Sequence, residues 1–380
     1  MRKTNDTNSD VSKMVAANND LGFYLLSQLL EQDVGKNVFL SSFSVAIALA
    51  MMYNGAEGKT KQAMAEVLGL TGLGFQEVNE ANAAFMSMQD GLDPKVQLVI
   101  ANSIWARNGI ELAPDFTRRI RDYYSGEVAN LDFRESGAAD IINKWVASKT
   151  NEKIRELVTS DGIRSAILIL INAIYFKGIW TSQFDEEKTE ERAFTLLDGS
   201  RKQHPMMSQS GHYAYYENEV FQAVSLPYGE RRISMYVFLP KPAISTDEFL
   251  KTLTIENWQQ WMSRFHEMEG HVVLPRFKVE YGADILPNLV ARGGQEFAGE
   301  DFLGMGGGPL VISKVIHKTF VEVNEEGTEA AAATAVVMVM GIGLVRRFSM
   351  IIDRPFFCAV RDNETGTLLF MGFVLDPMQS

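Results

Sequence analysis

The residues that most often carry chemistry are few in this chain and are not arranged as a catalytic site. There are five histidines and one cysteine, Cys358. A zinc peptidase of the commonest type would show His-Glu-x-x-His, and an α/β hydrolase would show Gly-x-Ser-x-Gly; neither pattern occurs. Cys358 lies in an apolar run with no histidine beside it, so we expect a buried small side chain. We therefore predict that the chain is not an enzyme and uses no metal and no cofactor.

One segment, residues 323–356, has local conformational preferences that conflict. Residues 330–333 are four alanines that favour a helix, whereas Val336 and Val337 favour extended chain. Gly327 can adopt backbone angles that are closed to other residues, which indicates a hinge. The small side chains after it could be solvated in one state and lie between two β-strands in another.

Composition and length predict one large domain. The chain has 380 residues, 46% of them apolar and spread throughout, and no linker divides it. The 36 basic and 48 acidic residues give a net charge of −12, which argues against nucleic acid or an anionic membrane as the main partner. The longest apolar run, 166–176, is too short to span a bilayer. Residues 1–10 contain no apolar signal region, so we expect a cytoplasmic protein, or an extracellular one whose leader has been removed.

Apolar periodicity and turn residues predict both helices and strands. Helical spacing predicts helices at 11–30, 45–53, 60–68, 75–88, 114–124, 140–151, 246–265 and 283–292. Apolar or alternating runs predict strands at 38–40, 96–105, 167–176, 233–239, 272–281 and 311–324. The run 167–176 is continuously apolar apart from Asn172, as expected for a strand that is covered on both faces.

Five ordered blocks and the hinge segment resemble the serpin family and together cover nearly the whole chain. The blocks are NVFLSSFS at 37–44, NAIYFKGIW at 172–180, LPY at 226–228, LPRF at 274–277, and FF, RDNETG and FMG between 356 and 372. The resemblance implies a single α+β domain over 11–380 after a flexible tail at 1–10. It also implies three β-sheets, about eight to nine helices and an exposed reactive-centre loop at about 325–348.

The resemblance further implies a monomer that inhibits a serine protease by conformational trapping. The protease would cut the loop and form a covalent acyl complex, and the freed loop would enter the main β-sheet as a new strand. The expected hinge comprises Glu325, Glu326, Gly327, Thr328, Glu329, Ala330, Ala331, Ala332, Ala333 and Thr334. Because alternate residues of a strand face one side, the inward set would be Thr328, Ala330, Ala332, Thr334, Val336 and Met338, all small or apolar.

The cleaved bond follows from the family's spacing. Counting from the hinge glycine places it between Gly341 and Ile342, whereas counting back from Phe356 gives Leu344, and Met340 is a further alternative. These residues suit elastase-, subtilisin- or chymotrypsin-like proteases. The pair at 346–347 is Arg-Arg and would suit trypsin-like enzymes, but it lies too far downstream for full insertion.

Two further groups of residues fall on positions with a role in serpins. Ser41, Ser44, Asn172 and His317 match the shutter, under the middle of the main sheet, and Trp180 matches the breach, at its top. We expect Ser44, Asn172 and His317 to form a hydrogen-bonded set that is broken and remade when the sheet opens. The plain alternatives are helix caps, a satisfied core amide and a core tryptophan. Residue 42 is serine where serpins usually have proline, which affects the rigidity of the turn.

Other functions remain open at this point. One alternative is a non-inhibitory serpin, such as a chaperone, carrier or storage protein; others are a relative that is cleaved but never traps, and an inhibitor of cysteine proteases. The hinge favours an inhibitor, because residues 328–334 contain no proline, no bulky residue and no charged residue except Glu329. The predicted helix at 75–88 is acidic and has no basic stripe, so no heparin site is expected.

Overall fold

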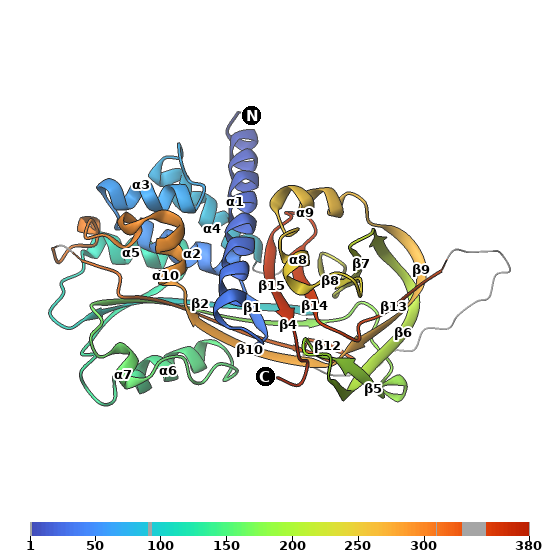
Figure 1. The fold of residues 1–380 in the computed structure, drawn as a ribbon. Coiled ribbons are helices and arrows are strands. Elements are labelled where there is room, and N and C mark those ends of the chain that lie inside the picture. Colours follow the sequence, from blue (N-terminus) through green and yellow to red (C-terminus); the bar gives the residue numbers. More distant parts are fainter. Residues whose placement is uncertain (1, 90–92, 309, 329–346, 380) are drawn as a thin grey trace.

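The computed structural model describes residues 2–89, 93–308, 310–328 and 347–379 (Figure 1). Its first helix, α1, spans Arg2–Gln32 and so includes most of the segment that we expected to be a flexible tail. A helix extends at little cost once a packed turn exists, and buried Leu21, Leu25 and Leu29 fix that part of α1. None of the helices in these residues combines the length and the apolar composition needed to cross a bilayer.

The other helices agree in outline with the predicted ones. They are α2 (Ser42–Tyr53), α3 (Gly58–Val67), α4 (Phe75–Gln89), α5 (Pro114–Tyr124), α6 (Ala138–Lys149), α7 (Ser160–Ile163), α8 (Thr246–Leu250), α9 (Ile255–Met262) and α10 (Leu286–Gly293), with short 3-10 helices at Glu186–Lys188, Gln295–Ala298 and Leu303–Met305. The single helix predicted at 246–265 is wrong. The chain forms two helices there, because the side chain of Thr254 accepts a hydrogen bond from the Asn257 N–H and caps the second one.

The described residues also contain fifteen strands. They are β1 (Val38–Leu40), β2 (Val96–Arg107), β3 (Glu127–Leu131), β4 (Leu168–Ile179), β5 (Glu190–Thr195), β6 (Arg201–Glu217), β7 (Phe221–Pro227), β8 (Ile233–Pro240), β9 (His266–Pro275), β10 (Phe277–Asp284), β11 (Lys314–Val323), β12 (Gly327–Thr328), β13 (Phe348–Ile351), β14 (Phe356–Asp362) and β15 (Leu368–Val374). The strand predicted at 272–281 is two strands in different sheets, divided at Arg276. Pro275 has no N–H to donate, so the first strand ends there.

The described strands form two hydrogen-bonded sheets. The six-stranded sheet, called the central sheet here, has the order β10-β11-β4-β2-β3, with β12 beside β4. The nine-stranded sheet has the order β1-β15-β14-β8-β7-β6-β9-β13, with β5 beside β6. The α+β fold is as expected, and the second and third sheets of that expectation are continuous because the long strand β6 pairs with β5, β7 and β9.

The strand β4 lies at the centre of the molecule, between two cores. Alternate side chains such as Leu170, Ile174 and Phe176 pack into the large core, which includes α1 and α2. The intervening side chains, such as Ile169 and Ile171, pack into a smaller core with α6. Figure 1 shows α6 and α7 on one side of the central sheet and α2 to α5 on the other. Coverage of both faces explains why the run 167–176 is apolar apart from Asn172.

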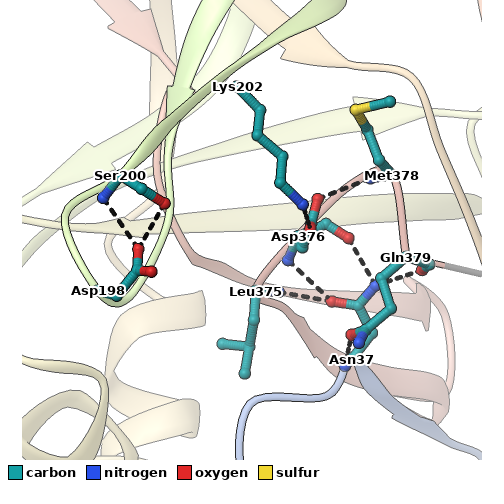
Figure 2. Close-up of polar contacts among 8 residues, drawn as sticks. All are labelled: Asn37, Asp198, Ser200, Lys202, Leu375, Asp376, Met378 and Gln379. Atoms are coloured by element: carbon teal, nitrogen blue, oxygen red, sulfur yellow. Dashed lines mark hydrogen bonds and ion pairs between the residues drawn. The ribbon is translucent and has the colours of Figure 1, made fainter.

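The C-terminal tail is tied to the first strand by one side chain. The amide nitrogen of Asn37 donates to the backbone oxygens of Asp376 at 2.7 Å and Gln379 at 2.6 Å, and its oxygen accepts from the Leu375 N–H at 2.7 Å (Figure 2). Lys202 pairs with the Asp376 carboxylate at 2.5 Å. The segments 37–44 and 356–379, far apart in sequence, are therefore held as one unit.

Candidate functional site

The pairing of β4 with β11 divides the central sheet into two halves. The strands are parallel hydrogen-bonded neighbours from the pair Lys314 and Ile169 to the pair Phe320 and Tyr175. We call this pairing the seam. On one side of it β4 pairs with β2, and on the other side β11 pairs with β10. Any new strand between β4 and β11 must break the seam.

A short strand already pairs with β4 above the seam. Gly327 and Thr328 form β12 and pair antiparallel with Ile179 and Gly178. Gly327 has φ = 145°, and a Cβ at this position would lie 2.0 Å from the carbonyl oxygen of Gly178. Only glycine fits so close to the β4 backbone. The predicted hinge glycine therefore stands where the chain turns onto the edge of β4.

Trp180 fixes the backbone just before this short strand. Its backbone N–H donates to the Glu326 oxygen at 2.9 Å, and its indole N–H donates to the Asn324 oxygen at 2.9 Å. The indole is 2% exposed and stacks on Tyr228, with ring centroids 4.2 Å apart. The residue that we expected at the top of the sheet thus contacts the segment that leads into the hinge.

Glu325 is the charged anchor of the same segment. Its carboxylate is 3% exposed and accepts hydrogen bonds from the Arg276 guanidinium at 2.6 to 2.8 Å, and another from the Thr189 hydroxyl. Its backbone oxygen accepts from the Phe184 N–H at 2.8 Å. A buried carboxylate needs such a partner, because an unpaired charge in the protein interior costs several kcal/mol. Glu325 is thus held in place, two residues before Gly327.

A buried polar network joins the two strands at the middle of the seam. The Asn172 amide nitrogen donates to the Ser44 backbone oxygen at 3.1 Å and to the Ser44 hydroxyl at 2.5 Å. The Asn172 oxygen therefore faces His317, whose Nδ1 lies 2.6 Å away and must carry the hydrogen. His317 Nε2 accepts the Ser41 N–H at 3.1 Å. The network brings together the four residues expected at the shutter, and Ser41 also caps α2 through the Ser44 N–H.

These contacts require a neutral histidine. Full burial lowers the pKa of His317 from 6.5 to about 3, against a smaller opposing effect of its hydrogen bond with Asn172. A second proton would have to sit on Nε2, which faces the N–H donor of Ser41. Protonation of His317 would therefore break the network on the β11 side of the seam.

The chain that follows the predicted cleavage site is anchored by an aromatic side chain. Phe348, the first residue of β13, stacks on Tyr215 with ring centroids 3.9 Å apart. A Cβ at Gly270 would lie 2.1 Å from the Phe348 ring, so glycine there leaves room for it. Arg347 pairs with Glu269 at 2.8 Å. The bond between Arg347 and Phe348 therefore joins an ion-paired residue to a buried one and is a poor protease site.

Several predicted site residues lie outside the residues that the structure describes. They are Glu329, Ala330, Ala331, Ala332, Ala333, Thr334, Met340, Gly341, Ile342 and Leu344. Of the expected hinge, the structure describes 325–328. Within the described ranges, no group of three or more His, Cys, Asp or Glu side chains could hold a metal ion. Burial raises the pKa of the Cys358 thiol.

Three residues of this region were not singled out from the sequence. Arg276 lies in the block LPRF, but nothing in the sequence links it to Glu325, 49 residues away. Thr189 follows an acidic segment that resembles an ordinary loop. Asn102 accepts a hydrogen bond from Asn172 at 2.5 Å and lies 70 residues from it. The only available signal for Asn102 was its polarity in the predicted strand 96–105, which also contains the polar residues Gln97 and Ser103.

Comparisons with known proteins agree on one family. The family model described as Serpin (serine protease inhibitor) matches residues 16–377. Serpin B6 of Pongo abelii is 36% identical over an alignment that covers 96% of this chain and 99% of that protein. The native-state crystal structure of tengpin, a thermophilic serpin, matches with a TM-score of 0.87 and 30% identity and covers 96% of this chain and 94% of that one. Human thyroxine-binding globulin with its bound ligand matches with a TM-score of 0.89 and 26% identity, covering 97% of this chain and 99% of that one.

Proposed function

The chain belongs to the serpin family, and on that premise we propose that it inhibits serine proteases as a suicide substrate. The observation that carries this proposal is the position of β12. Gly327 and Thr328 already pair with β4, directly above a seam that is still closed. A strand that continues from β12 along β4 would enter the space that opens when β4 and β11 separate.

The register of β12 supports insertion along the whole of β4. Residue 328 lies opposite Gly178, so a continuing antiparallel strand would place residue 338 opposite Leu168, the first residue of β4. Even-numbered residues would then lie opposite Phe176, Ile174 and the other side chains of the large core. This supports the inward set predicted from the sequence, in which Thr328, Ala330 and Ala332 are small.

The chemical step would be carried out by the protease, with this chain as its substrate. The serine hydroxyl oxygen of the protease attacks the carbonyl carbon of Gly341, the bond from that carbon to the Ile342 nitrogen breaks, and the nitrogen leaves with a proton as a new amino terminus. The protease is then held by an ester to Gly341. Insertion of 329–338 would carry it away from Ile342 before water cleaves the ester.

The free energy for this movement would come from the new strand. About a dozen residues at roughly 0.5 to 1.5 kcal/mol net for each backbone hydrogen bond supply on the order of 10 kcal/mol. The intact protein is then metastable and protected by a barrier. The bait at 340–344 suits elastase-, subtilisin- or chymotrypsin-like targets, and the packing of Phe348 argues against cleavage after Arg347.

The direct test is the formation of a complex that survives denaturation. We expect chymotrypsin, elastase or subtilisin to give a one-to-one complex that is stable in SDS, and mass spectrometry to show a released fragment that begins at Ile342. A fragment that begins at residue 347 would overturn the choice of bond. Complete cleavage without any complex would overturn the inhibitory mechanism.

Two neighbouring substitutions test insertion itself. We expect Thr328→Arg to leave cleavage intact and abolish trapping, because residue 328 would face the core. Glu329→Arg is the matched control, since residue 329 would face the other way and should still trap. Equal amounts of complex from both variants would contradict the inserted strand.

A non-inhibitory role is the second candidate, and one comparison supports it. The structure with the highest TM-score quoted above is that of thyroxine-binding globulin, solved with its bound ligand. A thermal melt before and after loop cleavage separates the two functions. An inhibitor should become far more heat-resistant once cut, whereas a passive carrier that does not insert its loop should not.

A further inference from the structure

Asn102 reaches the seam network from the strand on the other side of β4. It lies on β2 as the direct register partner of Asn172 in the antiparallel β2–β4 pair. Asn102 is 4% exposed and Asn172 is fully buried. The Asn172 amide nitrogen donates to the Asn102 oxygen at 2.5 Å. The two carboxamides therefore already face one another, one strand away from His317.

The hydrogen bonds fix which way each carboxamide points. The backbone oxygen of Ser44 can only accept, so the Asn172 nitrogen must be on that side. Asn102 must then present its oxygen to Asn172, and its own nitrogen points away. Among the described residues, that buried nitrogen has no hydrogen-bond partner. An unpaired buried donor is rare in folded proteins and costs free energy, so this one needs an explanation.

Opening of the seam would change the partners of Asn172 and leave Asn102 beside it. A strand inserted between β4 and β11 moves them apart by about 4.8 Å, the spacing of neighbouring strands. His317 then leaves with β11, and the Asn172 oxygen loses its donor. β2 and β4 lie on the same side of the opening, so the pairing of Asn102 with Asn172 is kept.

We propose that Asn102 is a positioning residue of the trapping reaction, whose free amide nitrogen replaces His317 as the donor to Asn172 when the seam opens. This inference rests on the proposed function. The end torsion of an asparagine side chain is soft, so the Asn102 carboxamide can rotate in place. The result is a reciprocal pair, in which each carboxamide donates one hydrogen bond to the other and accepts one in return.

Asn102 would therefore destabilise the closed central sheet and stabilise the opened one. In the intact protein the free nitrogen of Asn102 is an unpaired donor that raises the energy of the closed sheet. In the opened sheet it gives the Asn172 oxygen a donor from β2, in addition to the Thr334 hydroxyl that the register of β12 would place opposite Asn172. Asn102 thus favours opening in two ways, while Asn172 keeps Ser44 as an acceptor in both states.

The experiment compares thermal midpoints of the intact and loop-cleaved forms of Asn102→Leu. We expect the midpoint of the intact form to stay the same or rise, because the unpaired donor is removed and Asn172 keeps both contacts with Ser44. We expect the midpoint of the cleaved form to fall, and more protein to be cut for each protease trapped. Asn102→Ser, whose hydroxyl is too short to bridge the strands, should show the same pattern if the leucine variant folds poorly.

Asn79→Leu is the matched control, since Asn79 is a buried asparagine on α4 that binds Asn54 and Tyr124, away from the seam. We expect it to lower both midpoints equally and leave the ratio of cut to trapped protein unchanged. Equal shifts of both forms in the Asn102 variants would overturn this inference but not the proposed function. A wild-type protein that gains no heat resistance on cleavage would overturn both.

Discussion

The top and the middle of the seam are held by different kinds of interaction. At the top, β12 pairs with β4 through backbone contacts, and Glu325, two residues before Gly327, is anchored by a buried ion pair with Arg276. In the middle, the strands are joined by a network of neutral side chains that centres on Asn172 and His317. An ion pair can fix one end of a segment, whereas the neutral network can change partners without burying a charge.

This difference indicates an order of events. Gly327 and Thr328 already pair with β4, so on the proposed mechanism insertion would begin there. Separation of β4 from β11 would next require the buried hydrogen bond between His317 and Asn172 to break. On the proposed mechanism, the barrier to insertion would therefore lie at the middle of the seam, and the anchor at the top would set the starting point.

The largest effect is expected from breaking the anchor at the top. Arg276→Met leaves the Glu325 carboxylate buried without its cation, which should cost roughly 3 kcal/mol in the free energy of unfolding of the intact form. It should also speed the spontaneous loss of inhibitory activity on incubation, because the segment before the hinge is released. Denaturant unfolding and activity over time measure the two effects.

A control variant separates general destabilisation from release of the hinge. Arg232→Met breaks another ion pair with a buried carboxylate, that of Asp362, on the nine-stranded sheet. We expect a comparable loss of stability without faster inactivation. If both variants inactivate at the same rate, the anchor has no special role at the seam.

The second effect is a pH dependence from the middle of the seam. The pKa of His317 is about 3 in the folded protein and 6.5 in an ordinary environment, so the unfolded chain binds the proton first as the pH falls. The stability that depends on a neutral His317 is therefore fully present above pH 6.5 and is lost as the pH falls from 6.5 to about 3. In this range the free energy of unfolding should fall by up to about 1.4 kcal/mol per pH unit. The total loss by pH 5 should be roughly 2 kcal/mol.

Urea unfolding of the intact protein between pH 7 and pH 5 measures this dependence. His317→Gln removes the titrating group and should remove this part of the slope, although it lowers the stability at every pH. An unchanged slope in that variant would show that other groups cause the acid sensitivity, and that the network at the seam does not depend on a neutral histidine.

The smallest effect is expected where this chain departs from its family. Ser42 is the first residue of α2, where a missing N–H is harmless and the φ of proline is suitable. Its buried hydroxyl has no partner among the described residues. Ser42→Pro should therefore stabilise the intact form by about 0.5 to 1 kcal/mol through the unfolded chain. A thermal melt measures this; a lower midpoint would mean that the proline ring is not accommodated beside Gly22.

Much of the fold could be predicted from local patterns, and the main failures have local causes. The run 167–176 was recognised as a doubly covered strand because both cores require apolar side chains. The break between α8 and α9 was missed although Thr254 is a good capping residue, since the flanking apolar spacing continued through it. Pro275 ends one strand and Phe277 begins another in a different sheet, a division that periodicity alone does not show.

The site was predictable only as far as its residues stand in recognisable blocks. Trp180, Asn172 and His317 lie in or beside segments that resemble the family. The structure joins Asn172 and His317 at the seam and places Trp180 beside the segment that leads into β12. Asn102 and the partnership of Arg276 with Glu325 depend on contacts between residues distant in sequence. Such contacts are set by strand register, which a single sequence does not reveal.

If the cut loop becomes a new strand between β4 and β11, a disulfide across the seam should prevent trapping. Ile174 and Thr319 are register partners across the seam, whereas Val279 and Val321 are partners in the β10–β11 pair, which stays together. We predict that Ile174→Cys with Thr319→Cys, once oxidised, is cut by chymotrypsin but forms no stable complex, and that reduction restores trapping. The control pair Val279→Cys with Val321→Cys should trap in both redox states. A stable complex from the oxidised seam variant would show that trapping does not require a strand between β4 and β11.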